Sequence, residues 1–265
     1  MSSNSTNLND STKSSPHYSM FKQLKQTLAP IKRELTKQAR KFRYRKSLRS
    51  NIIELKGIKI HLDAGISENV AGSLYSGSYE AAELRIVQAQ ISKNDVVMEI
   101  GAGIGLISCF CAKQIGSDRV FAYEANPSLE PLIRKNYTLN DVSPSLTIGL
   151  LGAAPGEQTF YVEPDFWASS TVPGSAASTA ITVPVISLND EIKRINPSML
   201  IVDIEGGEYD LFQTIDFHNI QKIVIEVHEE FIGLEKVAIV MSKLAQAGFR
   251  VDQRYSSKRE LLLCR

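Results

Sequence analysis

Long apolar runs, a secretory leader and paired cysteines are all missing from this 265-residue chain. No apolar run approaches the roughly 20 residues that span a bilayer, and the Ser- and Asn-rich N-terminus has no apolar signal-peptide core. The cysteines Cys109, Cys111 and Cys264 are odd in number, with no second pair at zinc-ligand spacing, which indicates reduced thiols. We therefore expect a cytoplasmic protein.

The net charge is only +1, but the two signs are unevenly distributed. Residues 1–50 hold 12 Lys+Arg and 2 Asp+Glu, whereas residues 51–265 hold 18 and 27. We expect a disordered polar tail over 1–19. Over 20–50 we expect a basic amphipathic helical arm with an apolar stripe at three- and four-residue spacing. Such an arm fits an anionic membrane surface or RNA through its charges, or a homodimer or the chain's own main domain through its stripe.

The remaining residues, 51–265, are predicted to form one α/β domain. A hairpin is expected over 52–62, then a loop over 65–77 and a helix over 79–90. From residue 95 strands alternate with helices, which favours a doubly wound, mostly parallel sheet. The strands are predicted at 96–100, 119–123, 146–151, 159–162, 181–185, 199–204, 222–227, 249–254 and 260–264, and the helices at 106–115, 128–140, 209–215 and 234–247. A loop over 169–179 is long enough to act as a lid.

Three glycines at alternate positions, Gly101, Gly103 and Gly105, follow the first sheet strand. They let the backbone turn sharply and approach a ligand at the carboxyl end of the sheet. The dinucleotide fingerprint needs a further Gly where this chain has Leu106. Glu99 would repel a pyrophosphate but suits the amino group of a methionyl moiety, and Glu124 ends the next strand, where an acid accepts ribose hydroxyls. The pattern favours S-adenosylmethionine over a nicotinamide dinucleotide.

Four sequence blocks in this order resemble the FkbM-type methyltransferases. They are Glu-x-Gly-x-Gly-x-Gly from Glu99, VFAYEANP over 120–127, LIVDIEGGE over 200–208 and IVIEVH over 223–228. The resemblance implies a class I (Rossmann-like) S-adenosylmethionine-dependent enzyme that O-methylates a hydroxyl of a sugar, glycan or other small molecule. It also implies a seven-stranded sheet with an antiparallel last strand. The chain departs from the family after its third strand, where Gly152–Gly156 replaces an Asn-containing segment.

The same resemblance implies a set of cofactor-binding residues. A Tyr-Glu pair ahead of the glycine motif would close over the methionyl end of the cofactor. The set is Tyr79, Glu80, Glu99, Gly101, Gly103, Gly105, Glu124 and Ala125.

Candidate catalytic residues follow two later strands. Asp203 and Glu205 can act as a general base on a hydroxyl, and His228 can take a proton as a neutral imidazole. Glu205 and Glu208 can instead favour the start of the following helix. A divalent cation is left open, with Asp203 and Glu205 as its ligands if there is one. Phe166 and Trp167 either offer an aromatic platform for a substrate or pack in the core under the loop.

Two other functions compete with an O-methyltransferase. A nicotinamide-dependent oxidoreductase is disfavoured by Glu99 and the missing glycine. An RNA- or membrane-associated binding module on a methyltransferase fold remains open because of the basic arm, as does a peripheral location at the membrane.

Overall fold

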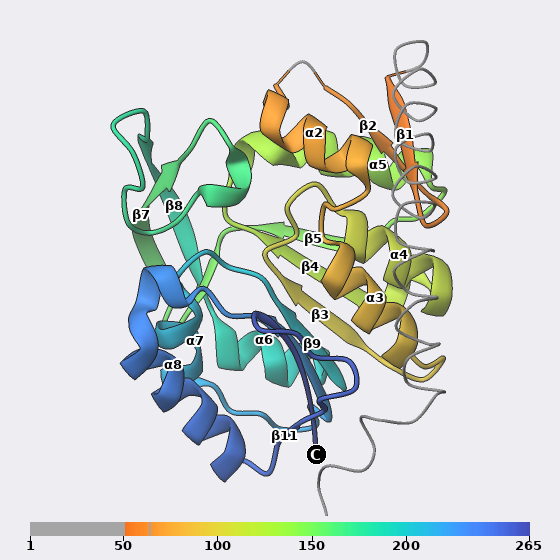
Figure 1. Ribbon diagram of the computed structural model, residues 1–265. Helices are drawn as coiled ribbons and strands as arrows, with labels where there is room; N and C mark the ends of the chain where they lie inside the picture. The colour runs from red at the N-terminus through yellow and green to blue at the C-terminus, as the bar shows by residue number, and fades with distance from the viewer. Residues whose placement is uncertain (1–50, 64) are drawn as a thin grey trace, which may run out of the picture. The chain divides into compact units, whose positions relative to one another are not determined.

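The computed structural model describes residues 51–63 and 65–265, so the predicted tail (1–19) and basic arm (20–50) lie outside the described residues. Its centre is a seven-stranded sheet (Figure 1). In spatial order the strands are β11 (Arg250–Val251), β12 (Glu260–Cys264), β10 (Lys222–Glu226), β9 (Met199–Val202), β3 (Val97–Ile100), β4 (Val120–Glu124) and β5 (Ser145–Ile148). Only β12 runs antiparallel to its neighbours in this sheet. The predicted doubly wound sheet with an antiparallel last strand is confirmed.

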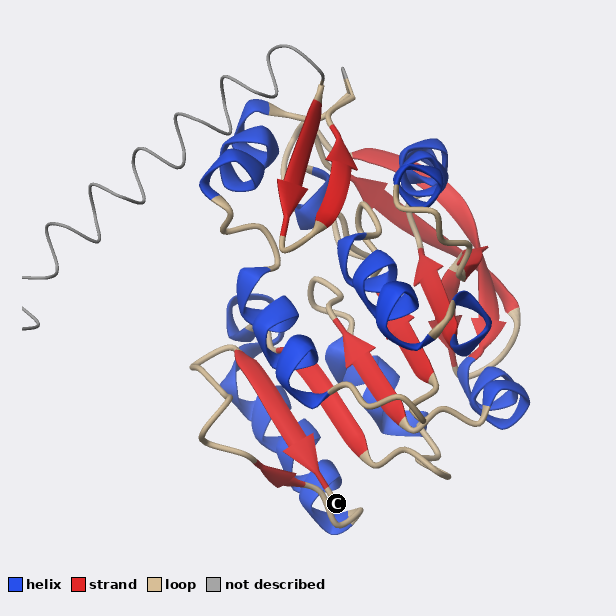
Figure 2. Cartoon of the chain, turned by 90° about the vertical axis from the view of Figure 1, so that its right-hand side faces the viewer, coloured by secondary structure: helices blue, strands red, loops and turns tan. Residues whose placement is uncertain are grey.

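Helices cover both faces of the sheet, in front of it and behind it in Figure 2. Strands β3 and β9 are buried along their whole length, as expected for apolar strands between two helical layers. Alternate residues face opposite layers, so Val97 and Met98 belong to different apolar cores. One layer contains α3 (Ala81–Gln90), α4 (Leu106–Ile115) and α5 (Glu130–Leu139), and the other α6 (Leu188–Ile195), α7 (Glu208–Thr214) and α8 (Glu229–Gln246). No helix in the described ranges is both long and apolar enough to cross a membrane.

The segment before the sheet differs in part from the prediction. The hairpin is present as β1 (Ile52–Leu55) and β2 (Ile58–His61). The loop predicted over 65–77 is wrong, because α2 (Glu68–Ser76) lies there. Ser67 caps its start by accepting a hydrogen bond from the Val70 amide, and Gly77 ends it at φ +73°. These caps stabilise a helix with only two buried side chains.

A second, three-stranded sheet begins just after the carboxyl end of β5. It contains β6 (Leu150–Gly152), β8 (Thr179–Ser187) and β7 (Gly156–Val162), in that order. The single strand predicted over 146–151 is wrong, because Gly149 at φ +153° separates β5 from β6 and a side chain there would meet the Pro184 carbonyl oxygen. Helix α6 was not predicted, although Leu188, Ile192 and Ile195 have helical spacing after the cap Ser187. Short 3₁₀ turns lie at Ser117–Arg119, Pro127–Leu129 and Phe166–Ala168 (η3).

Candidate active site

The glycine turn joins the end of β3 to α4. The Gly101 and Ala102 amides both donate to the Tyr123 carbonyl at 3.0 Å, which holds the turn against the end of β4. A Cβ atom on Gly101 would overlap the Asp203 carbonyl oxygen, and one on Gly103 would lie 2.6 Å from the Tyr79 hydroxyl. Both glycines have positive φ, +92° and +55°. Backbone conformation and close approach therefore both require glycine.

A cavity of about 590 Å³ opens beside this turn. Its walls come from the ends of β3 and β4, the turn between β6 and β7, η3, and the segment after β9. The volume lies within the roughly 300–1,000 Å³ of ligand sites. The carboxyl edge of the sheet, where α/β folds bind ligands, forms its floor.

Glu124 is fixed at the end of β4 by backbone amides. Its carboxylate accepts hydrogen bonds from the Gly103 and Asn126 amides, each at 2.8 Å. Burial raises the pKa of Glu124 to about 7, although these amides act to lower it. A carboxylate has about four acceptor positions, so these amides leave acceptor capacity for hydroxyl donors in the cavity that Glu124 lines.

Tyr79 and Glu80 also line the cavity, next to Gly103 of the glycine turn. The Tyr79 ring stacks on Trp167 at 6.4 Å between centroids and meets Phe166 edge-on at 6.3 Å. Glu80 adopts φ +46°, and its buried Oε2 atom has no hydrogen-bond partner. Burial raises the pKa of Glu80 well above its usual range. An uncommon backbone conformation together with an unpaired buried oxygen is typical of a functional site. Here it indicates that Glu80 accepts a hydrogen bond from a ligand.

Two members of the predicted cofactor set lie behind the cavity wall. Glu99 is 2% exposed and bonds to Ser108 of α4, and burial raises its pKa to about 8. Gly105 faces Ile133 and Tyr137 of α5. Neither residue lines the cavity. The other six line it together: Tyr79, Glu80, Gly101, Gly103, Glu124 and Ala125.

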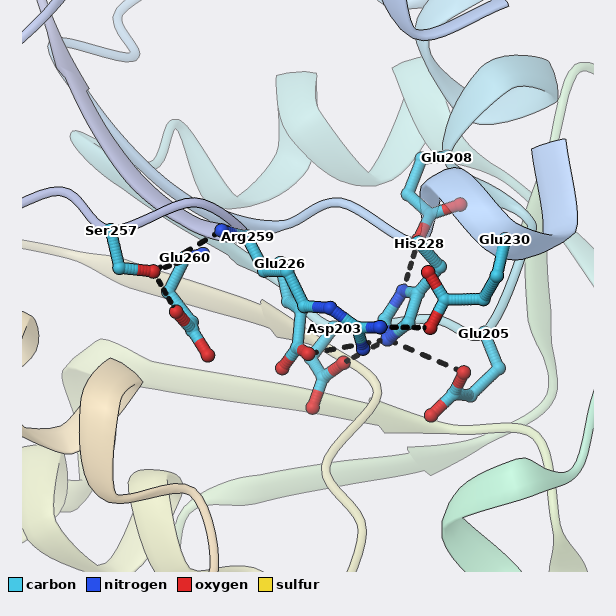
Figure 3. Close-up of polar contacts among 9 residues, drawn as sticks. All are labelled: Asp203, Glu205, Glu208, Glu226, His228, Glu230, Ser257, Arg259 and Glu260. Carbon is cyan, nitrogen blue, oxygen red and sulfur yellow. Dashed lines mark hydrogen bonds and ion pairs between the residues drawn. The ribbon is translucent and has the colours of Figure 1, made fainter. Parts of the chain in front are cut away.

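The structure brings the three candidate catalytic residues together (Figure 3). The His228 Nε2 atom lies 3.3 Å from a Glu205 oxygen and 3.9 Å from an Asp203 oxygen. On the other side of the ring, Nδ1 lies 2.5 Å from the fully buried Glu208 carboxylate. Asp203 and Glu205 line the cavity, whereas His228 stands behind them.

Electrostatics favour a charged imidazole in this group. Burial lowers the pKa of His228, but the hydrogen bond to Glu208 and the neighbouring carboxylates outweigh it and raise the pKa to about 9. Burial and the charge of Glu226 raise the pKa of Asp203 to about 8, and burial raises that of Glu205 to about 7. The imidazole is therefore a poor proton acceptor at neutral pH.

Sequence reasoning missed further acids beside these residues. Glu226 lies 3.5 Å from His228 Nε2. Glu83, 4% exposed on α3, shares a hydrogen bond with Glu226, and burial raises its pKa to about 9. One signal was available: Glu226 and His228 stand two positions apart at a strand end, so their side chains share one face. Glu83 lies far away in sequence, and no local pattern marks it.

These features define a Rossmann-like α/β domain with a ligand cavity beside the glycine turn. The chain belongs to the FkbM methyltransferase family, because the model of the methyltransferase FkbM domain matches residues 99–251. It is 25% identical over 154 residues to the hexuronic acid methyltransferase AglP of Haloferax volcanii. The matched region covers 55% of this chain and 61% of that protein. The chain spans less than two thirds of the length of the curated relatives it matches.

Solved methyltransferase structures resemble the chain at low sequence identity. One is the tRNA (uracil-54, C5)-methyltransferase of Pyrococcus abyssi with S-adenosyl-L-homocysteine, at 13% identity and a TM-score of 0.47, covering 80% of this chain and 43% of that one. Another is M. jannaschii TYW2 with AdoMet, at 14% identity and a TM-score of 0.41, covering 80% and 82%.

Proposed function

We propose that this protein transfers a methyl group from S-adenosylmethionine to a hydroxyl of an uncharged sugar, glycan or similar small molecule. The observation that carries the proposal is the shared cavity. The prepared carboxylates Glu80 and Glu124 stand on one part of its wall, and Asp203 and Glu205 on another.

The residues present fit the proposed donor. The free acceptor positions on Glu124 suit the two ribose hydroxyls, and Ala125 and Leu129 offer apolar contact to the adenine. The unpaired Oε2 of Glu80 suits the methionyl ammonium group. When bound, S-adenosylmethionine supplies a methyl group already activated by its sulfonium charge.

The chain's own contribution is to orient the acceptor and remove its proton. Asp203 and Glu205 present carboxyl oxygens to the cavity, where both can bind a hydroxyl and Glu205, whose pKa is the less strongly raised of the two, can accept its proton. Phe166 and Trp167 of η3 form an apolar wall next to the hydroxyls of Ser169–Thr171. Such a mixture of ring faces and hydroxyls suits a sugar.

The charge of the cavity supports an uncharged acceptor. Among the described residues, its lining contains no Lys, Arg or His but six acids: Glu80, Glu124, Glu157, Asp203, Glu205 and Asp210. An acceptor with its own carboxylate would meet the ionised members of this set and would find no basic side chain among the described lining residues to pair with. AglP is named a hexuronic acid methyltransferase. We expect this chain to prefer an uncharged acceptor instead.

A methyl-transfer assay tests this function. Labelled S-adenosylmethionine is incubated with the full chain and matched neutral and uronic-acid glycans. We expect label on neutral acceptors, and at least about a hundredfold loss of kcat in Asp203→Asn or Glu205→Gln with unchanged donor affinity. Transfer only to uronic acids would contradict the acceptor proposal. Transfer only to nitrogen or carbon acceptors would contradict O-methylation.

A further inference from the structure

Asp203, Glu226 and His228 stand where the ends of two neighbouring parallel strands, β9 and β10, meet. One ligand atom of each residue can be chosen so that all three lie within 4.8 Å of one another. We propose that these three residues bind a divalent metal ion, and that Mn²⁺ suits this set of ligands best.

The orientation of His228 favours a cation in front of its Nε2 atom. Glu208 is fully buried and holds Nδ1 at 2.5 Å, as carboxylates do when they orient a metal-binding histidine through its other ring nitrogen. Nε2 then points at carboxylate oxygens of Glu205 at 3.3 Å, Glu226 at 3.5 Å and Asp203 at 3.9 Å (Figure 3). In the absence of a metal ion, a proton on Nε2 balances these carboxylates, and a divalent ion would take the place of that proton.

A buried, unpaired carboxylate oxygen gives a second observation. Glu83 projects from α3 onto Glu226 and is 4% exposed, and its Oε1 atom has no hydrogen-bond partner. Oxygens of Glu83, Glu226 and Glu260 also lie within 4.8 Å of one another. Glu226 thus connects two groups of acids. Unpaired buried carboxylates are costly, and a divalent ion offsets that cost where a single proton leaves the other charges in place.

The donor set selects among ions. Two carboxylates suit Mg²⁺, Ca²⁺ and Mn²⁺, whereas an imidazole nitrogen suits transition metals. Mn²⁺ satisfies both preferences. Three protein ligands leave open coordination positions, and Asp203 lines the cavity.

The proposed ion would also define the acceptor more narrowly. Resting on the proposed function, we infer that it orients an acceptor with two adjacent hydroxyls by binding both oxygens. Asp203 then serves as a metal ligand, and Glu205 remains as the carboxylate that accepts the proton.

Direct Mn²⁺ binding tests the site without any assay of activity. The full chain is stripped with a chelator and titrated with Mn²⁺ alone, while electron paramagnetic resonance reports the free ion. We expect one ion per chain. We also expect at least about tenfold weaker binding in His228→Gln, in Glu226→Gln and in Glu208→Gln, which alters the carboxylate that orients His228. Glu229→Gln, an exposed acid beside His228, is the matched control and should bind as the unaltered chain does.

Calorimetry with S-adenosylhomocysteine runs in parallel on the stripped proteins. It shows that each variant is folded, and it separates a failure of the metal site from a failure of the proposed function. The metal site would be overturned if the protein binds S-adenosylhomocysteine but takes up no Mn²⁺, Zn²⁺ or Mg²⁺ at millimolar concentration. Equal Mn²⁺ affinity in His228→Gln and Glu229→Gln would overturn it as well.

Discussion

At the scale of single residues, carboxylates with different surroundings divide the work of the site. Glu124 is held by backbone amides, Glu80 keeps an unpaired oxygen, and Glu99 is sealed behind the glycine turn. The sequence marks Glu99 and Glu124 by their places at strand ends, and Glu80 by the resemblance to the family's Tyr-Glu pair. Burial and hydrogen bonding separate their roles.

Gly103 offers a direct residue-scale test. In Gly103→Ala the new methyl group meets the Tyr79 hydroxyl and the Glu80 carboxylate, so we expect at least about tenfold weaker binding of S-adenosylhomocysteine. Gly57→Ala is the control: its φ is +83°, but nothing lies within 4 Å of the added atom. Both variants lose about 1–2 kcal/mol of stability from backbone strain. Calorimetry showing equal affinity in the two variants would contradict the packing around Gly103.

Glu99 should make stability depend on pH. Its pKa is about 8 in the folded chain against 4.5 as the ordinary value, so between these values the folded state holds a proton that the unfolded state has lost. The free energy of unfolding therefore falls as pH rises through this window, by at most about 1.4 kcal/mol per pH unit from this group.

Glu99→Gln removes this contribution, so its stability relative to the unaltered chain should increase from pH 5 to pH 8. Denaturant titrations of both proteins across that range provide the measurement. Parallel pH profiles would show that Glu99 is not a buried acid with a raised pKa.

At the scale of elements, the sequence predicts what depends on local pattern. Helix α4 matches its predicted range, and the hairpin and the β3 and β4 strands match nearly as well, because apolar runs and glycines mark their ends. Helix α2 was missed because its two buried residues, Val70 and Leu74, are too few to establish a period. Sheet β6-β8-β7 depends on pairing between distant segments, and the contact of Glu83 with Glu226 likewise depends on how α3 packs.

The 3₁₀ turn η3 carries a built-in reporter. Trp167, the only tryptophan of the chain, lines the cavity and stacks on Tyr79. We expect S-adenosylhomocysteine to change its fluorescence in a saturable way, because the ligand alters the solvent around Tyr79 and Trp167. The Glu124→Ala variant should need a higher ligand concentration for the same change. Saturated binding by calorimetry with no fluorescence change would place the ligand away from η3.

At the scale of the whole molecule, charge separates a basic N-terminal segment from an acidic domain. The cavity is lined by residues between Tyr79 and Leu211. Deletion of residues 1–50, which contain none of the proposed donor-binding residues, should therefore leave donor affinity within about threefold.

We propose that residues 1–50 bind anionic membrane surfaces or RNA. Vesicle co-sedimentation and RNA retention should be lost on deletion, and in the full chain both should weaken steeply with salt. A change in sedimentation coefficient that salt does not affect would instead indicate association between subunits. If neither binding nor association changes, residues 1–50 do not provide the proposed contact.

The central claim is that the glycine turn and Glu124 bind S-adenosylmethionine. Its most direct test is calorimetric titration of S-adenosylhomocysteine and NADH into the full chain, Glu124→Ala and the control Glu130→Ala on the outer surface of α5. We predict binding of S-adenosylhomocysteine alone, weakened by about 1–3 kcal/mol in Glu124→Ala as two charge-assisted hydrogen bonds are lost, and unchanged in Glu130→Ala. Tighter binding of NADH, or equal affinity in a folded Glu124→Ala variant, would contradict the claim.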